Sequence, residues 1–252
     1  MRADKFFAEK YGSRTKAAQI IARGLIKRNG KVLSPSDDVK ENDVFELPEI
    51  SDFVSGGGNK LERGLSHFSV DVSGKIFVDL GASTGGFTDC LLRRGVKRVY
   101  CVDVGTSQLA PEIASKKEVI VMDGTNARYL TKRNFPEKID GIVSDLSFIS
   151  LRLILPVIFD VLEVNGEAFV LFKPQFECEG KNLTKHGILP VAHHKKLLAT
   201  FYDFAISLGL PTVDIVNAPI RERKNVEYIV RLQKGGRPID CETFLKRAAT
   251  LI

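Results

Sequence analysis

The stretch that decides the fold is KIFVDLGASTGGFTD, residues 75–89. It begins with an apolar run, ending at Asp79, that is typical of a strand buried on both faces of a parallel sheet. Gly81, Gly85 and Gly86 follow. Glycines at this point let the backbone turn tightly and approach a ligand at the start of the next helix. The stretch therefore predicts a strand, a cofactor-binding turn and a helix.

The spacing of these glycines narrows the class of cofactor. A dinucleotide-binding turn has the pattern GxGxxG, which requires glycine at the position of Ser83. The chain has GxxxGG instead, which favours S-adenosylmethionine over a cofactor with a pyrophosphate group. An oxidoreductase that uses a dinucleotide is disfavoured for the same reason.

Strand and helix patterns alternate along the chain beyond this turn. Further strands are predicted at 99–105, 118–124, 139–148 and 167–173. The strand patterns at 211–220 and 225–234 are separated only by a loop, which predicts a closing hairpin with a reversed last strand. The predicted fold class is α/β, with the doubly wound, Rossmann-like sheet of a class I methyltransferase.

Three acidic residues end successive predicted strands. Asp79, Asp103 and Asp123 all fall at the carboxyl edge of the sheet, where open α/β sheets bind their ligands. We expect Asp103 to accept hydrogen bonds from ribose hydroxyls and Asp123 to meet an adenine amino group. Capping of a helix is the alternative role for any one of these acids.

Four more charged residues fall on the same edge of the sheet, namely Lys60, Asp145, Lys173 and Glu227. Charges at the ends of apolar strands are costly to bury unless they are paired, so a Lys-Asp-Lys-Glu cluster is predicted. For each residue taken singly, a strand end that reaches solvent is the alternative. Phe148, close to Asp145, could stack on a flipped base, although aromatic residues after strands more often pack.

The N-terminal segment carries the excess positive charge. Residues 1–31 contain nine basic and two acidic residues, whereas the whole chain has a formal net charge of +6. Such clustering is the electrostatic footprint of a nucleic-acid anchor, with a solvated basic surface as the alternative. The residues expected to bind RNA are Arg2, Lys5, Ser13, Arg14, Lys16, Arg23, Lys27, Arg28 and Lys31.

The same segment has a recognisable order of elements. We expect Asp4 to cap a short helix ended by Gly12, and Ser13 to cap a second helix at 14–23. Asn29-Gly30 between apolar flanks is a strong hairpin signal, and 43–47 reads as another strand. The order resembles the S-four-type RNA-binding module, a small α+β domain.

Three parts of the chain follow from these patterns. Residues 1–47 are the predicted RNA-binding domain and residues 60–252 the predicted methyltransferase domain. The stretch between them, 48–59, contains a proline and three consecutive glycines, which predict a linker.

Composition excludes several classes of protein. The longest apolar stretch, 146–162, is interrupted by Arg152, Pro156 and Asp160, and the first residues lack the apolar core of a secretory signal. The four cysteines are far apart, without a CxxC pair or a histidine at metal-ligand spacing. We therefore expect a reduced, cytoplasmic protein with neither a bound metal nor an integral membrane partner.

Four longer motifs together resemble the TlyA (hemolysin A) family of FtsJ-like ribose methyltransferases. They are DLGASTGGFTDCLL at 79–92, VDVGTSQL at 102–109, SDLSFISL at 144–151 and FKPQFE at 172–177. The resemblance covers nearly the whole chain. It departs from the family at Gly56, where arginine is usual, and at Lys224, where glycine is usual.

The resemblance implies a 2′-O-methyltransferase that acts on cytidine in ribosomal RNA, with ribosomal RNA or ribosomal subunits as partners and S-adenosylmethionine as cofactor. The chain is compact, which is more typical of members that modify the large subunit. The implied catalytic tetrad is Lys60, Asp145, Lys173 and Glu227. The implied cofactor-binding residues are Asp79, Gly81, Ala82, Ser83, Thr84, Gly85, Gly86, Phe87, Asp103, Val104, Asp123, Gly124 and Asp145.

In this interpretation Lys173 contacts the ribose oxygen, Asp145 and Glu227 orient the lysine, and Lys60 completes the charge pairing. The sequence leaves open whether Lys173 is a base or an electrostatic holder. Two other functions are weighed against the enzyme. A membrane-active hemolysin would need an amphipathic or spanning segment, which the sequence does not show. A non-catalytic assembly factor would keep the RNA-binding module but would not bind the cofactor.

Overall fold

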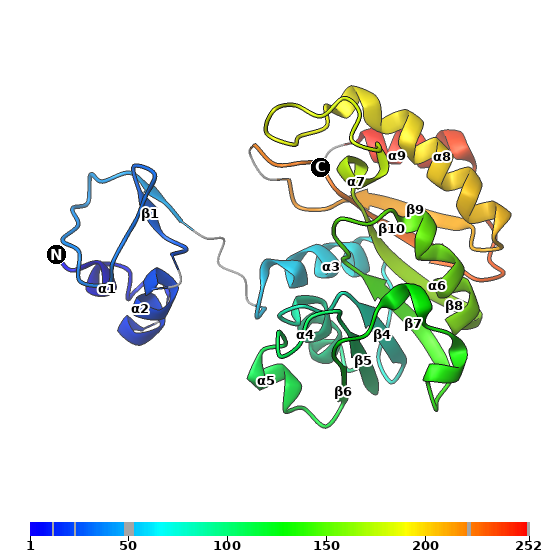
Figure 1. Cartoon of the computed structure of the whole chain (residues 1–252), viewed down its shortest axis with the longest axis horizontal. Coiled ribbons are helices and arrows are strands. Elements are labelled where there is room, and N and C mark those ends of the chain that lie inside the picture. The colour runs from blue at the N-terminus through cyan, green and yellow to red at the C-terminus, as the bar shows by residue number, and fades with distance from the viewer. Residues whose placement is uncertain (12, 23, 48–52, 221–222, 251–252) are drawn as a thin grey trace. The chain divides into compact units, whose positions relative to one another are not determined.

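The structure, a computed structural model, describes residues 1–11, 13–22, 24–47, 53–220 and 223–250 (Figure 1). The chain divides into two compact units, Met1–Ser51 and Asp52–Ile252. Each unit has buried hydrophobic clusters of its own.

The N-terminal unit combines two helices with a small antiparallel sheet. Its elements are α1 (Ala3–Phe6), α2 (Arg14–Ala22), β1 (Lys27–Arg28), β2 (Lys31–Val32) and β3 (Phe45–Glu46), and its sheet has the order β2-β1-β3. Asn29 and Gly30 join β1 to β2 with φ of 51° and 78°, the left-handed values that a two-residue hairpin turn requires. The predicted hairpin is therefore confirmed. Phe7, Ile21 and Ile26 lie in the core of this unit.

The prediction that Asp4 caps the first helix is wrong. The helix begins at Ala3, so Asp4 lies inside its first turn. The Asp4 carboxylate is buried and pairs with the guanidinium groups of Arg2 and Arg14, each at 3.0 Å. Asp4 therefore ties α1 to the start of α2, which explains an acidic residue in a basic segment.

The ends of the two helices differ in how well the sequence locates them. The first helix stops at Phe6, and turns occupy the following residues up to 11, so its predicted extension towards Gly12 is wrong. The second helix starts directly after Ser13, as predicted. Gly12 and Arg23 lie outside the described residues.

The ion pairs of Asp4 predict an unusually acidic carboxyl group. The hydrogen bond from Arg2, helped by Arg14, lowers the pKa of Asp4 from 3.8 to about 2. Because the folded-state pKa is depressed, the pairs stabilise the unit above pH 3.8, and this contribution is lost as the pH falls towards 2. An NMR titration of the Asp4 carboxyl carbon should show a midpoint near 2, and Arg14→Ala should raise it. A midpoint near 3.8 in the unaltered chain would contradict the pairing.

The C-terminal unit is built on a seven-stranded sheet with the order β6-β5-β4-β7-β8-β10-β9. The strands are β4 (Ile76–Leu80), β5 (Arg98–Val102), β6 (Val119–Met122), β7 (Ile139–Ser144), β8 (Leu162–Phe172), β9 (Thr212–Asn217) and β10 (Tyr228–Gln233). Strands β4 to β8 pair in parallel, and β10 is antiparallel to both β8 and β9. The predicted α/β class and the reversed last strand are confirmed.

Helices cover both faces of this sheet (Figure 1). They are α3 (Gly56–His67), α4 (Gly86–Arg93), α5 (Pro111–Ala114), α6 (Leu155–Val161), α7 (Pro174–Glu177), α8 (His194–Ser207) and α9 (Cys241–Ala249). Four short 3-10 turns add η1 (Ala127–Tyr129), η2 (Lys132–Asn134), η3 (Leu151–Leu153) and η4 (Val191–His193).

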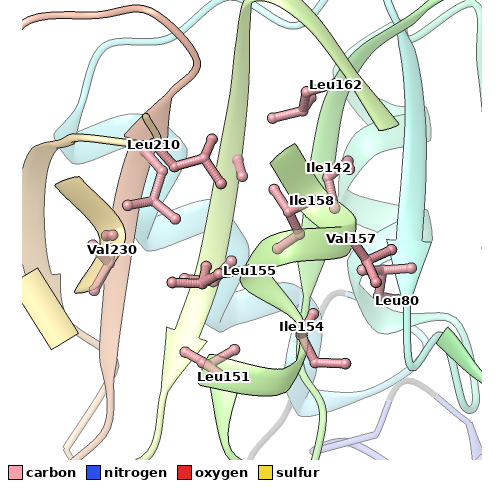
Figure 2. Close-up of a cluster of buried hydrophobic side chains, with 14 of the residues drawn as sticks. Leu80, Ile142, Leu151, Ile154, Leu155, Val157, Ile158, Leu162, Leu210 and Val230 are labelled. Atoms are coloured by element: carbon pink, nitrogen blue, oxygen red, sulfur yellow. The ribbon is translucent and has the colours of Figure 1, made fainter. Parts of the chain in front are cut away.

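Alternation along the strands separates two hydrophobic cores. On β8, Val170 and Phe172 belong to the cluster that packs under α6, α8 and α9, while Phe169 and Leu171 face α3 and α4. Figure 2 shows part of the first cluster, which α6 fills with side chains such as Ile158. Because helices cover both faces of the sheet, the ends of its central strands are where a ligand can approach them.

The predicted boundary at residue 60 differs from the structure. The glycine run that suggests a linker begins α3 instead, so the helix starts at Gly56 and carries Lys60 in its second turn. A Cβ on Gly58 would lie 2.3 Å from the ring of Phe53, and one on Gly86 would lie 2.9 Å from the Gly58 nitrogen. Gly86 is therefore required by the close packing of α4 against α3, and Gly58 by the packing of Phe53 against α3, which sequence pattern alone does not reveal.

Candidate active site at the carboxyl edge of the sheet

A cavity of about 510 Å³ opens at the carboxyl edge of the sheet. It lies among the first turns of α3, the turn between β4 and α4, and the ends of β5, β7 and β8. Its lining residues are Ser55, Gly57, Lys60, Gly81, Ala82, Ser83, Thr84, Gly86, Phe87, Asp103, Val104, Asp145, Leu146, Ser147, Lys173 and Glu227. The volume is within the range of cofactor sites, about 300–1,000 Å³.

The glycine-rich turn forms one wall of the cavity. Gly81 has φ of 84°, and a Cβ there would lie 2.9 Å from Cδ2 of Leu146. Gly85, with φ of 95°, is the N-cap of α4, and no side chain caps that helix. The first turn of α4 therefore presents its backbone to the cavity, which favours polar or anionic ligand groups.

Asp103 fixes the opposite side of this turn. Its carboxylate accepts hydrogen bonds from the backbone N–H groups of Ser83 and Gly105, both at 2.8 Å. Each carboxylate oxygen has more than one acceptor position, so these bonds leave capacity for ligand hydroxyls. Val104 next to it is 70% exposed and also lines the cavity, where it offers an apolar surface.

The four charged residues predicted to cluster are brought together at the mouth of this cavity. The Lys173 ammonium lies 2.6 Å from Asp145, and the Lys60 ammonium lies 2.7 Å from Glu227. Lys60 is also 3.5 Å from Asp145, so the two ion pairs join into one chain of alternating charge. All four side chains are at most about one-fifth exposed, and Lys173 is the most buried of them.

Comparison with known proteins agrees with this geometry. Residues 53–234 match the family model of the FtsJ-like methyltransferases, and residues 1–45 match that of the S4 domain. The chain belongs to the FtsJ-like methyltransferases.

Relatives of this methyltransferase span nearly its whole length. Hemolysin A of Brachyspira hyodysenteriae is 40% identical over 236 residues, which cover 91% of this chain and 98% of that protein. The 16S/23S rRNA (cytidine-2′-O)-methyltransferase TlyA of Mycobacterium tuberculosis is 34% identical, over 88% of this chain and 84% of that protein. A solved structure described as a hemolysin from Streptococcus thermophilus is 33% identical with a TM-score of 0.75, over 99% of this chain and 95% of that one. The resemblance to the TlyA family is confirmed.

Three residues expected to bind the cofactor in this methyltransferase lie behind or beside the cavity. Asp79 is fully buried and accepts a hydrogen bond from the Thr88 hydroxyl at 2.7 Å. Burial raises the pKa of Asp79 to about 7, and the charges of Asp145 and Asp103 act in the same direction. Its Oδ1 has no hydrogen-bond partner among the described residues. Contact of Asp79 with the cofactor stays a prediction.

Asp123 and Gly124 do not line the cavity. The Asp123 carboxylate accepts a hydrogen bond from the backbone N–H of Ser107 at 2.7 Å, so it braces the loop that follows β5. Asp123 therefore has a local role in a loop rather than the helix-capping role given as the alternative, and its contact with adenine stays a prediction.

Sequence reasoning missed two polar residues that touch the charged cluster. The Lys173 ammonium donates to the Ser147 hydroxyl at 2.9 Å, and the Gln175 amide donates to Glu227 at 3.4 Å. Serine and glutamine after a strand carry no signal of their own, although their place beside Asp145 and Lys173 in the motifs would justify a closer look.

Several cations of the N-terminal unit already have partners in the protein. Arg2 and Arg14 pair with Asp4, and Arg28 pairs with Asp43 at 3.0 Å. Lys5 and Lys31 are exposed, and Ser13 and Lys27 are half-buried. The side chain of Lys16 and the whole of Arg23 lie outside the described residues. RNA contact by each of these residues stays a prediction.

The four cysteines, Cys90, Cys101, Cys178 and Cys241, are all free thiols. Among the described residues, no helix has the length and apolar character needed to cross a membrane. That same part of the chain brings no three His, Cys, Asp or Glu side chains into the arrangement of a metal site.

The contact between Gly86 and α3 predicts a sharp effect of a single methyl group. In Gly86→Ala the new Cβ would meet the backbone of Gly58 at 2.9 Å and the Ser55 hydroxyl at 2.2 Å, so α3 would have to move away from the cavity. We expect a loss of about 1–3 kcal/mol in the free energy of unfolding and weaker cofactor binding. Thermal unfolding and calorimetry measure the two effects.

Gly74→Ala is the matched control for this substitution. Gly74 has φ of 71°, but a Cβ there meets nothing within 4 Å. It should therefore cost some stability through the backbone alone and leave cofactor binding intact. Equal cofactor affinity in the Gly86→Ala and Gly74→Ala variants would contradict the role given to the contact.

Proposed function

We propose that this methyltransferase transfers a methyl group from S-adenosylmethionine to the ribose 2′-hydroxyl of a cytidine in ribosomal RNA. The observation that carries the proposal is the Lys-Asp-Lys-Glu cluster at the mouth of a glycine-lined cavity. The TlyA relatives that are rRNA (cytidine-2′-O)-methyltransferases support the substrate class.

The cavity fits the proposed cofactor by the chemistry of its lining. The glycine turn and the start of α4 would hold the amino-acid part, Asp103 would accept hydrogen bonds from the ribose, and Val104 would pack against the base. When bound, S-adenosylmethionine supplies an electrophilic methyl group on a positively charged sulfur. The protein's task is then to bring a weak nucleophile into line, and positioning of this kind lowers barriers substantially.

Lys173 is placed to hold that nucleophile. Its ammonium has three donors and forms an ion pair with Asp145 and a hydrogen bond to Ser147, which leaves a donor for a ribose oxygen. Asp145 pairs directly with Lys173, whereas Glu227 acts through Lys60, which pairs with both carboxylates. This arrangement favours the role of an orienting hydrogen-bond donor over that of a free base.

Removal of Lys173 tests the proposal directly. Lys173→Ala should lower kcat for methyl transfer to ribosomal RNA by at least about 100-fold, the usual scale for a positioned acid–base or donor group. Affinity for S-adenosylmethionine should stay nearly the same, because the glycine turn and Asp103 are untouched. Radiolabelled methyl transfer and calorimetry provide the two readouts.

Lys181→Ala is a suitable control, because Lys181 is exposed and pairs only with Glu179. Unchanged methyl transfer in Lys173→Ala would remove the cluster from the mechanism. Mapping of ribose methylation by reverse-transcription stops, in cells with and without the gene, would identify the nucleotide. Tight RNA binding without any heat of cofactor binding would instead support a non-catalytic assembly factor.

Binding to RNA should weaken steeply with salt. If four to six phosphates are contacted, the slope of log K against log salt should be roughly −3 to −5. Lys5→Ala combined with Lys31→Ala removes two exposed cations of the S4 domain and should make the slope shallower by about 1–2. Lys138→Ala, at an exposed position of the larger unit, is the control, and an identical slope in both variants would argue against the S4 domain as the anchor.

A further inference from the structure

The loop from Asp145 to Ser150, which joins β7 to η3, carries three features of the site. Asp145 belongs to the charged cluster, and Ser147 accepts a hydrogen bond from Lys173. Phe148 follows Ser147 in the loop, and 91% of its surface is exposed. The conformation of this one loop therefore decides where three site groups lie.

The backbone of this loop is in an unfavourable conformation. Phe148 has φ of 61°, in the left-handed region that side chains with a bulky Cβ substituent rarely adopt. Such a conformation persists only where the surrounding structure holds it. The Phe148 ring is almost fully exposed. It contacts the ring of Phe176, with 5.1 Å between the ring centroids.

Glu177, the last residue of α7, holds the far end of the loop. Its Oε2 accepts a hydrogen bond from the Ser150 hydroxyl at 2.6 Å, and its Oε1 accepts one from the backbone N–H of Leu151 at 2.8 Å. The Ser150 hydroxyl in turn accepts from the backbone N–H of Arg152 at 3.2 Å. One carboxylate thus fixes both the end of the loop and the start of η3.

The Glu177 carboxylate that accepts these hydrogen bonds is partly buried. Burial raises the pKa of Glu177, and the bonds from Ser150 and Leu151 act in the opposite direction. A buried carboxylate destabilises the fold unless its hydrogen bonds compensate for the lost solvation.

Lys173 and the short helix α7 that follows it therefore contact the loop at its beginning, middle and end. Lys173, immediately before the helix, contacts the first part of the loop, and Glu177 contacts the last part. Phe176, within the helix, contacts Phe148 in the middle.

We propose that Glu177 is a positioning residue that clamps the 145–150 loop, so that Ser147 and Phe148 are in place before the target nucleotide arrives. The inference rests on the proposed function, because it assigns the loop to the nucleotide site. Glu177 itself need not touch substrate or cofactor.

The absence of tryptophan from the chain gives a clean reporter of the loop. Phe148→Trp introduces a single tryptophan at the exposed tip, whose fluorescence anisotropy reports how firmly the loop is held. In this background Glu177→Gln should lower the anisotropy. Ser150→Ala removes the other partner of the same hydrogen bond and should give the same change.

Kinetics in the unlabelled chain supply the second readout. Glu177→Gln should lower kcat/KM for RNA about tenfold, equivalent to about 1.4 kcal/mol of transition-state stabilisation. Affinity for S-adenosylmethionine should be unchanged, because Glu177 does not line the cavity. The Glu177→Gln and Ser150→Ala effects should be non-additive when combined, since they break one interaction.

Glu179→Gln is the matched control, since Glu179 is two residues away, exposed, and paired with Lys181 at 2.9 Å. Unchanged anisotropy in both Glu177→Gln and Ser150→Ala, with unchanged kcat/KM for RNA, would overturn the clamp. If one variant fails to fold, the other decides. A chain that neither binds S-adenosylmethionine nor methylates RNA would refute the proposed function, whereas the tryptophan reporter would still show whether Glu177 holds the loop.

Discussion

Two lysines and two carboxylates stabilise one another in a place where none of them could remain alone. Lys60, Asp145, Lys173 and Glu227 are mostly withdrawn from water, and loss of one partner from such a group usually costs about 3–5 kcal/mol. The four residues come from α3 and from the ends of β7, β8 and β10, which are far apart in the sequence. Only a completed sheet brings them together, so the site depends on the whole fold of the larger unit.

The position of Lys60 depends in turn on how closely α3 approaches α4. Gly86 of α4 leaves room for the backbone of α3 at Gly57 and Gly58, and Gly57 and Gly86 also line the cavity. At this point both the packing of the helices and the binding of a ligand therefore require glycine. This dual use explains why a run of three glycines, which normally indicates flexibility, begins a well-packed helix here.

The sequence predicts most strongly where a feature repeats or ends a strand. The charged cluster could be expected because Asp145 and Lys173 each follow an apolar strand pattern, whereas Glu227 opens the reversed last strand, so that all three meet at one edge of the sheet. The hairpin at Asn29-Gly30 could be expected from local backbone preference alone.

Contacts that no strand-end or turn pattern marks could not be predicted from the sequence. The pairing of Asp4 with Arg14, the packing that turns glycines into the first turn of α3, and the bond between Glu177 and Ser150 each join parts of the chain that carry no mutual signal. Asp123 shows the reverse case, in which a strand-end position is right but the side chain bonds to its own neighbourhood at Ser107.

The antiparallel strand β10 lies between β8 and β9, although it is the last strand to leave the ribosome. Until it is synthesised, the long strand β8 has an open edge, and β9 has no neighbour with which to pair. An open strand edge is a template for association with other chains. Until this last segment is made, the larger unit therefore has an edge at β8 with which other chains can pair, and its charged cluster lacks Glu227.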